Sequence, residues 1–249
     1  MAGGEGTRLR PLTVSRPKPM VPVCNRPVME YTLDLLKRHG IETVVVTLHY
    51  KAEDIVSYFG DGTEFGHKII YSVESIPLGT AGSVKEVQEY IGSETFMVIS
   101  GDGLTDIDLS RAIAFHKEKK AVATLVLMRV NNPLEYGVVI TDESGAIQCF
   151  LEKPTWGEVF SDQVNTGIYI LEPEIFDLME KNKEYDFSRD IFPHLLKEKK
   201  GLYGYVASGY WCDIGDIDHY AAAHRDMFNG KVLQEMVGAQ RAPGVWIGE

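Results

Sequence analysis

No apolar run in this chain of 249 residues approaches the ~18 residues that a membrane-spanning helix needs. Basic residues are also few: 25 lysines and arginines stand against 36 aspartates and glutamates, which gives a formal net charge of −11. A surface that binds the phosphate backbone of a nucleic acid has to be basic. We therefore expect neither a membrane nor a nucleic acid as partner. A single nucleotide is not excluded, because it needs only a few local cations.

Cysteine is rare as well. Cys24, Cys149 and Cys212 are an odd number of thiols without the spacing of a metal site, which suits a reducing compartment and predicts a cytoplasmic protein. The His-Glu-x-x-His pattern of zinc hydrolases and the Gly-x-Ser-x-Gly pattern of serine hydrolases are both missing. Neither type of hydrolase is therefore favoured.

Glycines and cations are concentrated at the start of the chain. Gly3, Gly4 and Gly6 are followed by Arg8 and, a little later, by Lys18. Glycines let backbone N–H groups approach a phosphate chain closely, and the cations balance its charge. The spacing is neither that of a dinucleotide-binding fingerprint nor that of a Walker A loop. A flexible terminal segment is the alternative, but the prolines that follow favour an ordered phosphate-binding loop.

Helical and strand-like segments alternate through the first hundred residues. Their apolar periodicity predicts helices over 27–39, over 52–59 and after residue 82, and strands over 43–48, 68–73 and 96–100. Alternation at this spacing implies a largely parallel, doubly wound α/β sheet. Ligands of such sheets bind beyond the carboxyl ends of the strands.

The rhythm changes in the second half of the chain. Short strand-like runs there suggest antiparallel additions that enclose a second part of the site. We expect a helix over 109–119, strands over 121–130, 137–140, 146–151 and 164–171, and helices over 174–181, 188–199 and 217–228.

Two acidic residues follow predicted strands. Asp102 stands in Ser-Gly-Asp-Gly, and Asp213 stands in Trp-Cys-Asp-Ile-Gly. A lone Asp-Gly pair is more often only a turn. Two carboxylates at strand ends, together with a cationic glycine-rich loop, favour a site for Mg²⁺ bound to phosphates.

Three further segments offer groups for a second substrate. Glu152 and Lys153 supply an acceptor for sugar hydroxyls and a cation for a phosphate, although a surface ion pair is the simpler alternative. Asn165 precedes a glycine that interrupts a strand-like run, which allows close approach of a ligand. Gly137 follows Glu-Tyr in a similar setting, where the tyrosine could equally pack in the core.

The ordered motifs Gly-Gly-x-Gly-Thr-Arg-Leu, Pro-Lys-Pro, Pro-Leu-Gly-Thr-Ala, Gly-Asp, Glu-Lys-Pro, Asn-Thr-Gly and Trp-x-Asp-x-Gly resemble those of the sugar-phosphate nucleotidyltransferase family. Within that family the chain most resembles bacterial mannose-1-phosphate guanylyltransferases. The resemblance implies a Rossmann-like (GT-A-like) doubly wound mixed sheet. It also implies a catalytic domain over residues 1–229, followed over 230–249 by a linker and the start of a left-handed β-helix.

The resemblance also implies roles for individual residues. Arg8, Lys18 and Asp102 would be catalytic, and Asp102 and Asp213 would hold Mg²⁺. Nucleotide-binding residues would be Ala2, Gly3, Gly4, Gly6, Thr7, Glu74, Gly79 and Thr80, and sugar-phosphate-binding residues would be Gly137, Glu152, Lys153 and Asn165.

The implied reaction transfers a nucleoside monophosphate from a nucleoside triphosphate to a sugar-1-phosphate and releases pyrophosphate. Glu74 could accept from both N1–H and the exocyclic amine of guanine, which favours GTP, and the resemblance to mannose-1-phosphate guanylyltransferases favours mannose-1-phosphate as the sugar. A solvated glutamate at a strand end is an equally good interpretation of Glu74. Glucose-1-phosphate uridylyl- or thymidylyltransferase activity and a non-catalytic regulatory module that binds sugar nucleotides remain the alternatives. Whether two copies of the chain associate is open.

Members of the family place a short hydrophobic strand directly before the glycine-rich loop. The chain starts inside the motif, so the resemblance implies that the first strand of the sheet is missing and that the chain is truncated at both ends. A strand end aims the loop amides at the phosphates. The expectation is therefore a chain that is unstable or nearly inactive as it stands.

Overall fold

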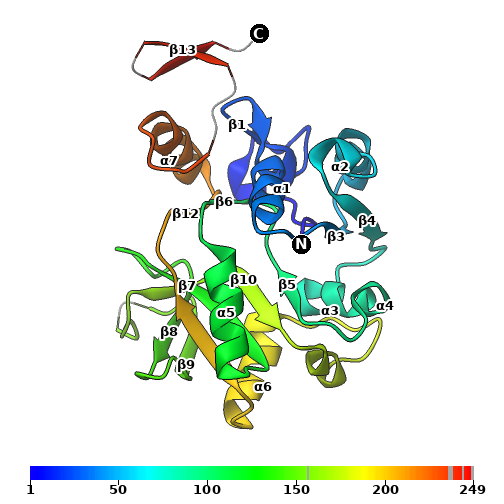
Figure 1. Cartoon of the computed structure of the whole chain (residues 1–249), viewed down its shortest axis with the longest axis vertical. Helices are drawn as coiled ribbons and strands as arrows, with labels where there is room; N and C mark the ends of the chain where they lie inside the picture. Colours follow the sequence, from blue (N-terminus) through cyan, green and yellow to red (C-terminus); the bar gives the residue numbers. More distant parts are fainter. Residues whose placement is uncertain (156, 235–237, 243, 248–249) are drawn as a thin grey trace. The chain divides into compact units, whose positions relative to one another are not determined.

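The computed structural model describes residues 1–155, 157–234, 238–242 and 244–247. These residues form two compact units. Unit 1 consists of Met1, Glu74–Ser100 and Asp108–Ser208, and unit 2 consists of Ala2–Val73, Gly101–Ile107 and Gly209–Glu249. Figure 1 labels helices and strands of both units where there is room.

In unit 2, strands β3 (Thr43–Leu48) and β4 (Lys68–Val73) form a parallel pair in which Thr43 lies opposite Lys68 and Leu48 opposite Val73. The connection between them contains helix α2 (Ala52–Phe59), as in a β-α-β crossover. Apolar side chains of α1 (Val28–Arg38), α2 and the two strands form one core cluster, which includes Leu33, Leu48 and Phe59. This packing buries the second half, Val46 to Leu48, of the strand that the sequence predicts over 43–48.

A second cluster of unit 2 surrounds a short antiparallel pair. Strand β6 (Gly103–Thr105) pairs with β12 (Trp211–Asp213), and Leu104 lies opposite Cys212. Both of these side chains are buried, in a cluster that also contains residues of α1 and of α7 (Ile217–Phe228). Unit 2 also contains the small antiparallel pairs β1 (Pro22–Val23) with β2 (Arg26–Pro27) and β13 (Ala239–Ala242) with β14 (Val245–Ile247).

Unit 1 is built on a six-stranded mixed sheet. Its central strand β10 (Gln163–Leu171) pairs antiparallel with β5 (Phe96–Val98), β7 (Ala123–Arg129) and β8 (Gly137–Thr141). Strand β9 (Ile147–Glu152) pairs antiparallel with β8, and β11 (Leu202–Val206) pairs parallel with β7.

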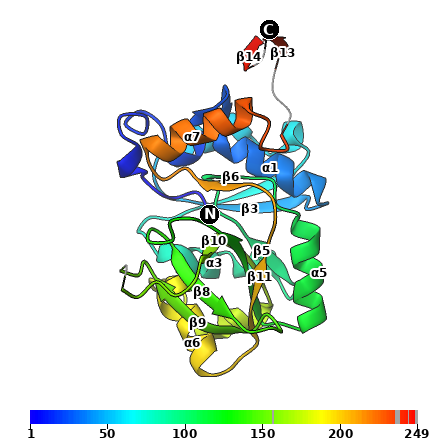
Figure 2. The ribbon, with the colours of Figure 1, turned by 90° about the vertical axis from the view of Figure 1, so that its left-hand side faces the viewer.

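Helices cover the sheet of unit 1. Helix α5 (Leu109–Lys119) packs against β7, β10 and β11, whereas α6 (Phe192–Lys197) packs against β9 and β11 (Figure 2). Helices α3 (Gly79–Glu86) and α4 (Gln88–Ile91) follow the loop after β4. The core between sheet and helices is rich in aromatic rings, of which Phe187 and Phe192 stack with their centroids 5.6 Å apart.

The α/β class with a mixed sheet is confirmed. The helices predicted over 27–39, 52–59, 109–119 and 217–228 are α1, α2, α5 and α7. The expectation of a largely parallel sheet is too simple, because the predicted strand over 96–100 pairs antiparallel with β10, and within the described residues β3 and β4 pair only with each other. The helix expected over 174–181 is a short 3₁₀ segment (Pro173–Leu178), a form common in connectors.

Candidate functional site

Two carboxylates of unit 2 converge on one ammonium group. The Lys18 Nζ atom lies 2.8 Å from an oxygen of Asp102 and 3.1 Å from an oxygen of Asp213. The β6–β12 pairing explains the meeting, because Asp213 lies opposite Gly103, the residue after Asp102. Side chains alternate along a strand, so the buried Cys212 leaves Asp213 on the other face.

Lys18 is largely buried, and the residues around it favour its protonated, positively charged form. Burial by itself would lower the pKa of Lys18, but the carboxylates of Asp102 and Asp213 raise it, and the net direction is upward. Burial raises the pKa of Asp213, and the Lys18 ammonium opposes this shift. The cluster is therefore a desolvated set of charges whose members depend on one another.

The glycine-rich loop reaches the same cluster. Gly6 has a φ of +64°, and a Cβ atom there would lie 3.0 Å from Thr13 Cγ2 and 3.1 Å from Lys18 Cβ. The Thr13 hydroxyl donates a 2.7 Å hydrogen bond to the Gly6 carbonyl. Glycine at this position therefore lets the loop fold against Lys18. Around Gly4, by contrast, no atom lies within 4 Å of a hypothetical Cβ.

The beginning of the loop is fixed to β3. Ala2 N–H donates to the Thr47 carbonyl at 3.0 Å, and Tyr50 N–H reaches the Gly3 carbonyl at 3.5 Å. Thr7 begins a 3₁₀ turn, Thr7–Leu9, which contains Arg8. The Arg8 guanidinium lies beside Gly215, since a Cβ on Gly215 would be 3.2 Å from its NH2 nitrogen.

Unit 2 thus brings together Gly6, Arg8, Lys18, Asp102 and Asp213, which the sequence predicts as one site. The two carboxylates fit a magnesium ion by their chemistry, because Mg²⁺ prefers hard oxygen ligands and is commonly held by one or two carboxylates. The Lys18 ammonium between them shows that this position accommodates positive charge.

The predicted base-binding residues lie in unit 1, around the start of α3. A Glu74 carboxylate oxygen accepts from Leu78 N–H at 3.4 Å, so this side chain also supports the turn of its own loop. Gly79 has a φ of +72°, and a Cβ there would lie 2.5 Å from the Tyr185 carbonyl oxygen. The Thr80 hydroxyl donates to Asp186 at 2.9 Å.

Three of the predicted sugar-binding residues lie on the strand ends of unit 1. Gly137 and Glu152 are opposite each other in the β8–β9 pair, and a Cβ on Gly137 would be 2.7 Å from a Glu152 carboxylate oxygen. Asn165 lies at a register shift of β10, where its amide nitrogen donates to the Tyr169 hydroxyl at 3.0 Å. Lys153 directly follows β9, with a φ of +47°.

The sequence does not indicate that two polar residues, Asp186 and Ser188, lie near Glu152. Burial raises the pKa of Glu152, Lys153 lowers it, and the nearby Asp186 raises it further. The nearby Ser188 side chain lowers the pKa of Glu152. Asp186 and Ser188 lie at the start of a helical segment, where short polar side chains are expected merely as caps. The sequence therefore gives no signal that they adjoin Glu152.

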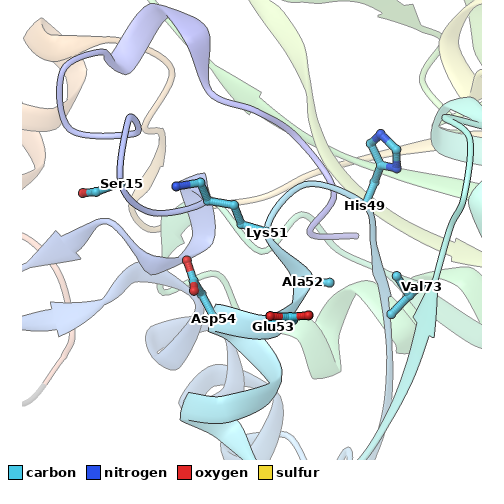
Figure 3. Close-up of a pocket in the computed structure, with 7 residues that line it drawn as sticks. All are labelled: Ser15, His49, Lys51, Ala52, Glu53, Asp54 and Val73. Atoms are coloured by element: carbon cyan, nitrogen blue, oxygen red, sulfur yellow. The ribbon is translucent and has the colours of Figure 1, made fainter.

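A pocket of about 470 Å³ in unit 2 contains none of the predicted site residues. Figure 3 shows Lys51 extending towards Ser15, with Glu53 and Asp54 at the start of α2. The Lys51 ammonium donates to the Val14 carbonyl at 2.9 Å. The remaining lining residues are His49, Ala52 and Val73.

Two further findings concern the whole described part of the chain. None of its helices combines the length and the apolar character needed to cross a membrane. Cys24, Cys149 and Cys212 are all free thiols.

A family profile described as nucleotidyl transferase matches residues 1–230. The chain therefore belongs to the nucleotidyl transferase family. It is 40% identical over 262 aligned positions to a UTP–glucose-1-phosphate uridylyltransferase of Synechocystis sp., an alignment that covers 100% of this chain and 68% of the relative. It is 38% identical over 231 positions to a mannose-1-phosphate guanylyltransferase of Mycobacterium tuberculosis, covering 92% of this chain and 64% of that one.

Solved structures agree with this assignment. A Bacillus anthracis structure described as a glucose-1-phosphate thymidylyltransferase superposes with a TM-score of 0.82 at 27% identity, covering 90% of this chain and 92% of that chain. The similarity includes the mixed α/β sheet. The chain spans 58% of the length of a Drosophila melanogaster relative, so that relative contains further residues that this chain does not match.

Proposed function

We propose that residues 1–229 form a sugar-1-phosphate nucleotidyltransferase, which transfers a nucleoside monophosphate from a nucleoside triphosphate to a sugar-1-phosphate and releases pyrophosphate. The observation that carries this proposal is the placement of Lys18 between Asp102 and Asp213 beside the glycine-rich loop. Family membership and the names of the relatives support the same reaction class.

Nucleotidyl transfer to a sugar-1-phosphate requires stabilisation of negative charge and does not require a general base. A phosphate monoester has its second pKa near ~6, so the attacking oxygen of a sugar-1-phosphate is already ionised at neutral pH. The barrier lies in bringing two polyanions together and in stabilising the charge that develops on the phosphorus and the leaving group. Arg8 and Lys18 would contact the triphosphate, and Lys153 would contact the phosphate of the sugar.

Asp102 and Asp213 would hold the magnesium ion. When bound, the ion would neutralise phosphate charge and favour departure of pyrophosphate. Lys18 would then be free to leave the carboxylates for a phosphate oxygen, so one cation would replace another without leaving the two carboxylates unpaired.

The substrate pair favoured by the sequence is GTP with mannose-1-phosphate. Guanine offers two donors on its Watson–Crick edge, and the Glu74 carboxylate can accept both. The mycobacterial relative carries the name of this activity. The competing pair is UTP with glucose-1-phosphate, and two observations favour it: the Synechocystis relative aligns over 100% of this chain, and Glu74 already accepts from Leu78 N–H.

Assays with a set of substrate pairs test both the proposed reaction class and the identity of the substrates. Pyrophosphate release is measured for GTP, UTP and dTTP, each with mannose-1-phosphate and with glucose-1-phosphate, in the presence and absence of Mg²⁺. Turnover of at least one pair that depends on Mg²⁺ is expected, and the pair with the highest kcat/KM identifies the substrates. Binding of sugar nucleotides without turnover of any pair would instead favour a regulatory module.

A further inference from the structure

The strand pair that brings Asp102 and Asp213 together is very short. Strands β6 and β12 pair from Trp211 opposite Thr105 to Asp213 opposite Gly103, and in the part of the chain that the structure describes they pair only with each other. An isolated pair of strands is marginally stable at best. The register of this pair must therefore be held by contacts beyond the pair itself.

The register decides which way Asp213 points. In the observed pairing Cys212 is buried, and an Asp213 carboxylate oxygen lies 3.1 Å from the Lys18 ammonium. Because side chains alternate along a strand, a slip by one residue would turn Asp213 towards the core and Cys212 towards the cation. The site therefore depends on this register.

The Asp106 side chain closes the pair at the end away from the site. Asp106 N–H donates to the Tyr210 carbonyl at 3.1 Å, and Tyr210 N–H donates to the Asp106 Oδ1 atom at 2.6 Å. The Thr105 hydroxyl donates to the same Tyr210 carbonyl at 2.7 Å. Gly209 allows this close approach, since its φ is +116° and a Cβ there would lie 2.6 Å from Asp106 Oδ1.

The other carboxylate oxygen of Asp106 holds the segment that follows α7. It accepts from Leu233 N–H at 2.7 Å, and the Leu233 carbonyl accepts from the Arg38 guanidinium at 2.9 Å. Both oxygens of Asp106 thus accept from backbone N–H groups of distant segments, which fixes the orientation of the carboxylate.

We propose that Asp106 is a positioning residue that fixes the register of β6 with β12 and so holds Asp102 and Asp213 where both reach one cation. This inference rests on the proposed function, because the magnesium-binding role of the two carboxylates belongs to it. Along an extended strand Asp106 lies about 13 Å beyond Asp102. It therefore acts through the strands and not by contact with the ion.

The proposal predicts a change in the magnesium requirement. Asp106→Ala removes the acceptor of Tyr210 N–H, so the Mg²⁺ concentration for half-maximal activity should rise about tenfold and kcat should fall about tenfold, as for loss of a residue that supports metal ligands. The KM for the sugar-1-phosphate should change little, because its predicted binding residues lie in unit 1. Asp106→Asn keeps an acceptor oxygen, so both quantities should stay within about threefold of the wild type.

Metal binding is also measured without turnover. Melting temperatures are recorded over a series of Mg²⁺ concentrations in the absence of substrates, and the concentration that gives half of the increase should be about tenfold higher in Asp106→Ala than in the wild type. The matched control is Arg38→Met, which releases the Leu233 carbonyl but makes no change in the strand pair. It should keep the wild-type magnesium requirement in both measurements.

A lower melting temperature of Asp106→Ala with an unchanged magnesium requirement would overturn the proposal, because Asp106 would then support the fold alone. If Asp106→Ala does not fold, Thr105→Val provides the test, since it removes only the hydroxyl donor to the Tyr210 carbonyl. Its magnesium requirement should rise about threefold, as for loss of one hydrogen bond, and an unchanged value would overturn the proposal. Absence of wild-type turnover with every substrate pair would overturn the proposed function, whereas the metal titration would still decide the role of Asp106.

Discussion

Lys18 and Asp213 are 195 positions apart in the sequence, yet an Asp213 carboxylate oxygen lies 3.1 Å from the Lys18 ammonium. Together with Asp102, this pair places two negative charges around one positive charge. Removing the ammonium should leave the carboxylates repelling each other in a partly desolvated place.

The variant Lys18→Met should therefore be less stable than the wild type by about 1–3 kcal/mol in metal-free buffer, a discounted value for a pair that is not fully buried. Millimolar Mg²⁺ should raise its melting temperature more than that of the wild type, because the ion can take the place of the ammonium. Thermal unfolding with and without metal measures both effects. Equal metal-induced shifts in the two proteins would show that the carboxylates do not bind the ion.

Asp102→Asn should lower kcat by about 10²–10³-fold, the range seen when one key electrostatic group is lost from an active site. The substitution keeps the shape of the side chain and removes its charge. Asp218→Asn, on an exposed position of α7, is the control for removal of an acidic charge from unit 2 and should retain wild-type turnover. Near-wild-type turnover of Asp102→Asn at saturating Mg²⁺ would remove Asp102 from the mechanism.

Gly6→Ala should lose both stability and activity. The positive φ of +64° costs an alanine about 1–2 kcal/mol, and its Cβ would press on Thr13 and Lys18. Gly40 is the control, since it ends α1 with a φ of +72° and no atom lies within 4 Å of a hypothetical Cβ there. Gly40→Ala should lose similar stability in denaturant unfolding but keep its turnover. If both variants keep wild-type kcat/KM, the crowding at Gly6 has no functional consequence.

Glu74→Gln should change the choice of base if the carboxylate reads guanine. An amide can accept only through its single oxygen, so kcat/KM for GTP should fall about tenfold relative to that for UTP. Glu94→Gln, an exposed position of unit 1, serves as control. An unchanged ratio of GTP to UTP would assign Glu74 to supporting the loop through Leu78 alone.

Glu172 should contribute stability that depends on pH. Burial tends to raise its pKa, but hydrogen bonds from Thr95 and His116 outweigh this and lower the pKa below the usual value. A carboxyl whose folded-state pKa is lowered stabilises the protein above its unfolded pKa, and this contribution is lost as the pH falls through the folded value. Because Glu172 is partly exposed, Glu172→Gln should cost only about 1 kcal/mol at pH 7, or about 2–4 °C in melting temperature.

The difference between Glu172→Gln and the wild type should shrink as the pH falls below the ordinary pKa of a glutamate and then through the lower folded-state pKa of Glu172, below which both side chains are neutral. Melting temperatures over a pH series measure it. A difference that stays constant down to pH 3 would assign the loss to packing rather than to charge.

Local signals made part of this structure predictable. The run of β-branched residues over 43–48 and the periodicity over 217–228 define their elements without help from distant residues. Asn-Thr-Gly within a strand-like run also indicated the irregularity that appears as the register shift of β10 after Asn165. Such features depend on neighbours in the sequence.

Other features depend on partners far along the chain. The pairing of β5 with β10 joins Val98 to Tyr169, and no property of the strand at 96–98 indicates an antiparallel partner. The closeness of Ser188 to Glu152 is unpredictable for the same reason, because the two residues lie on elements that are far apart in the sequence. The contact of Lys18 with both acids could be expected only through resemblance to a family, and the geometry then provides its physical basis.

The two units also differ in how they use the chain. Apart from Met1 and the short excursion Gly101–Ile107, unit 1 occupies one continuous stretch from Glu74 to Ser208, whereas unit 2 is made of segments on both sides of it. Unit 1 therefore has the character of an insertion into unit 2. Because Gly209–Glu249 of unit 2 follows that stretch, a ribosome must synthesise all of unit 1 before unit 2 can be completed.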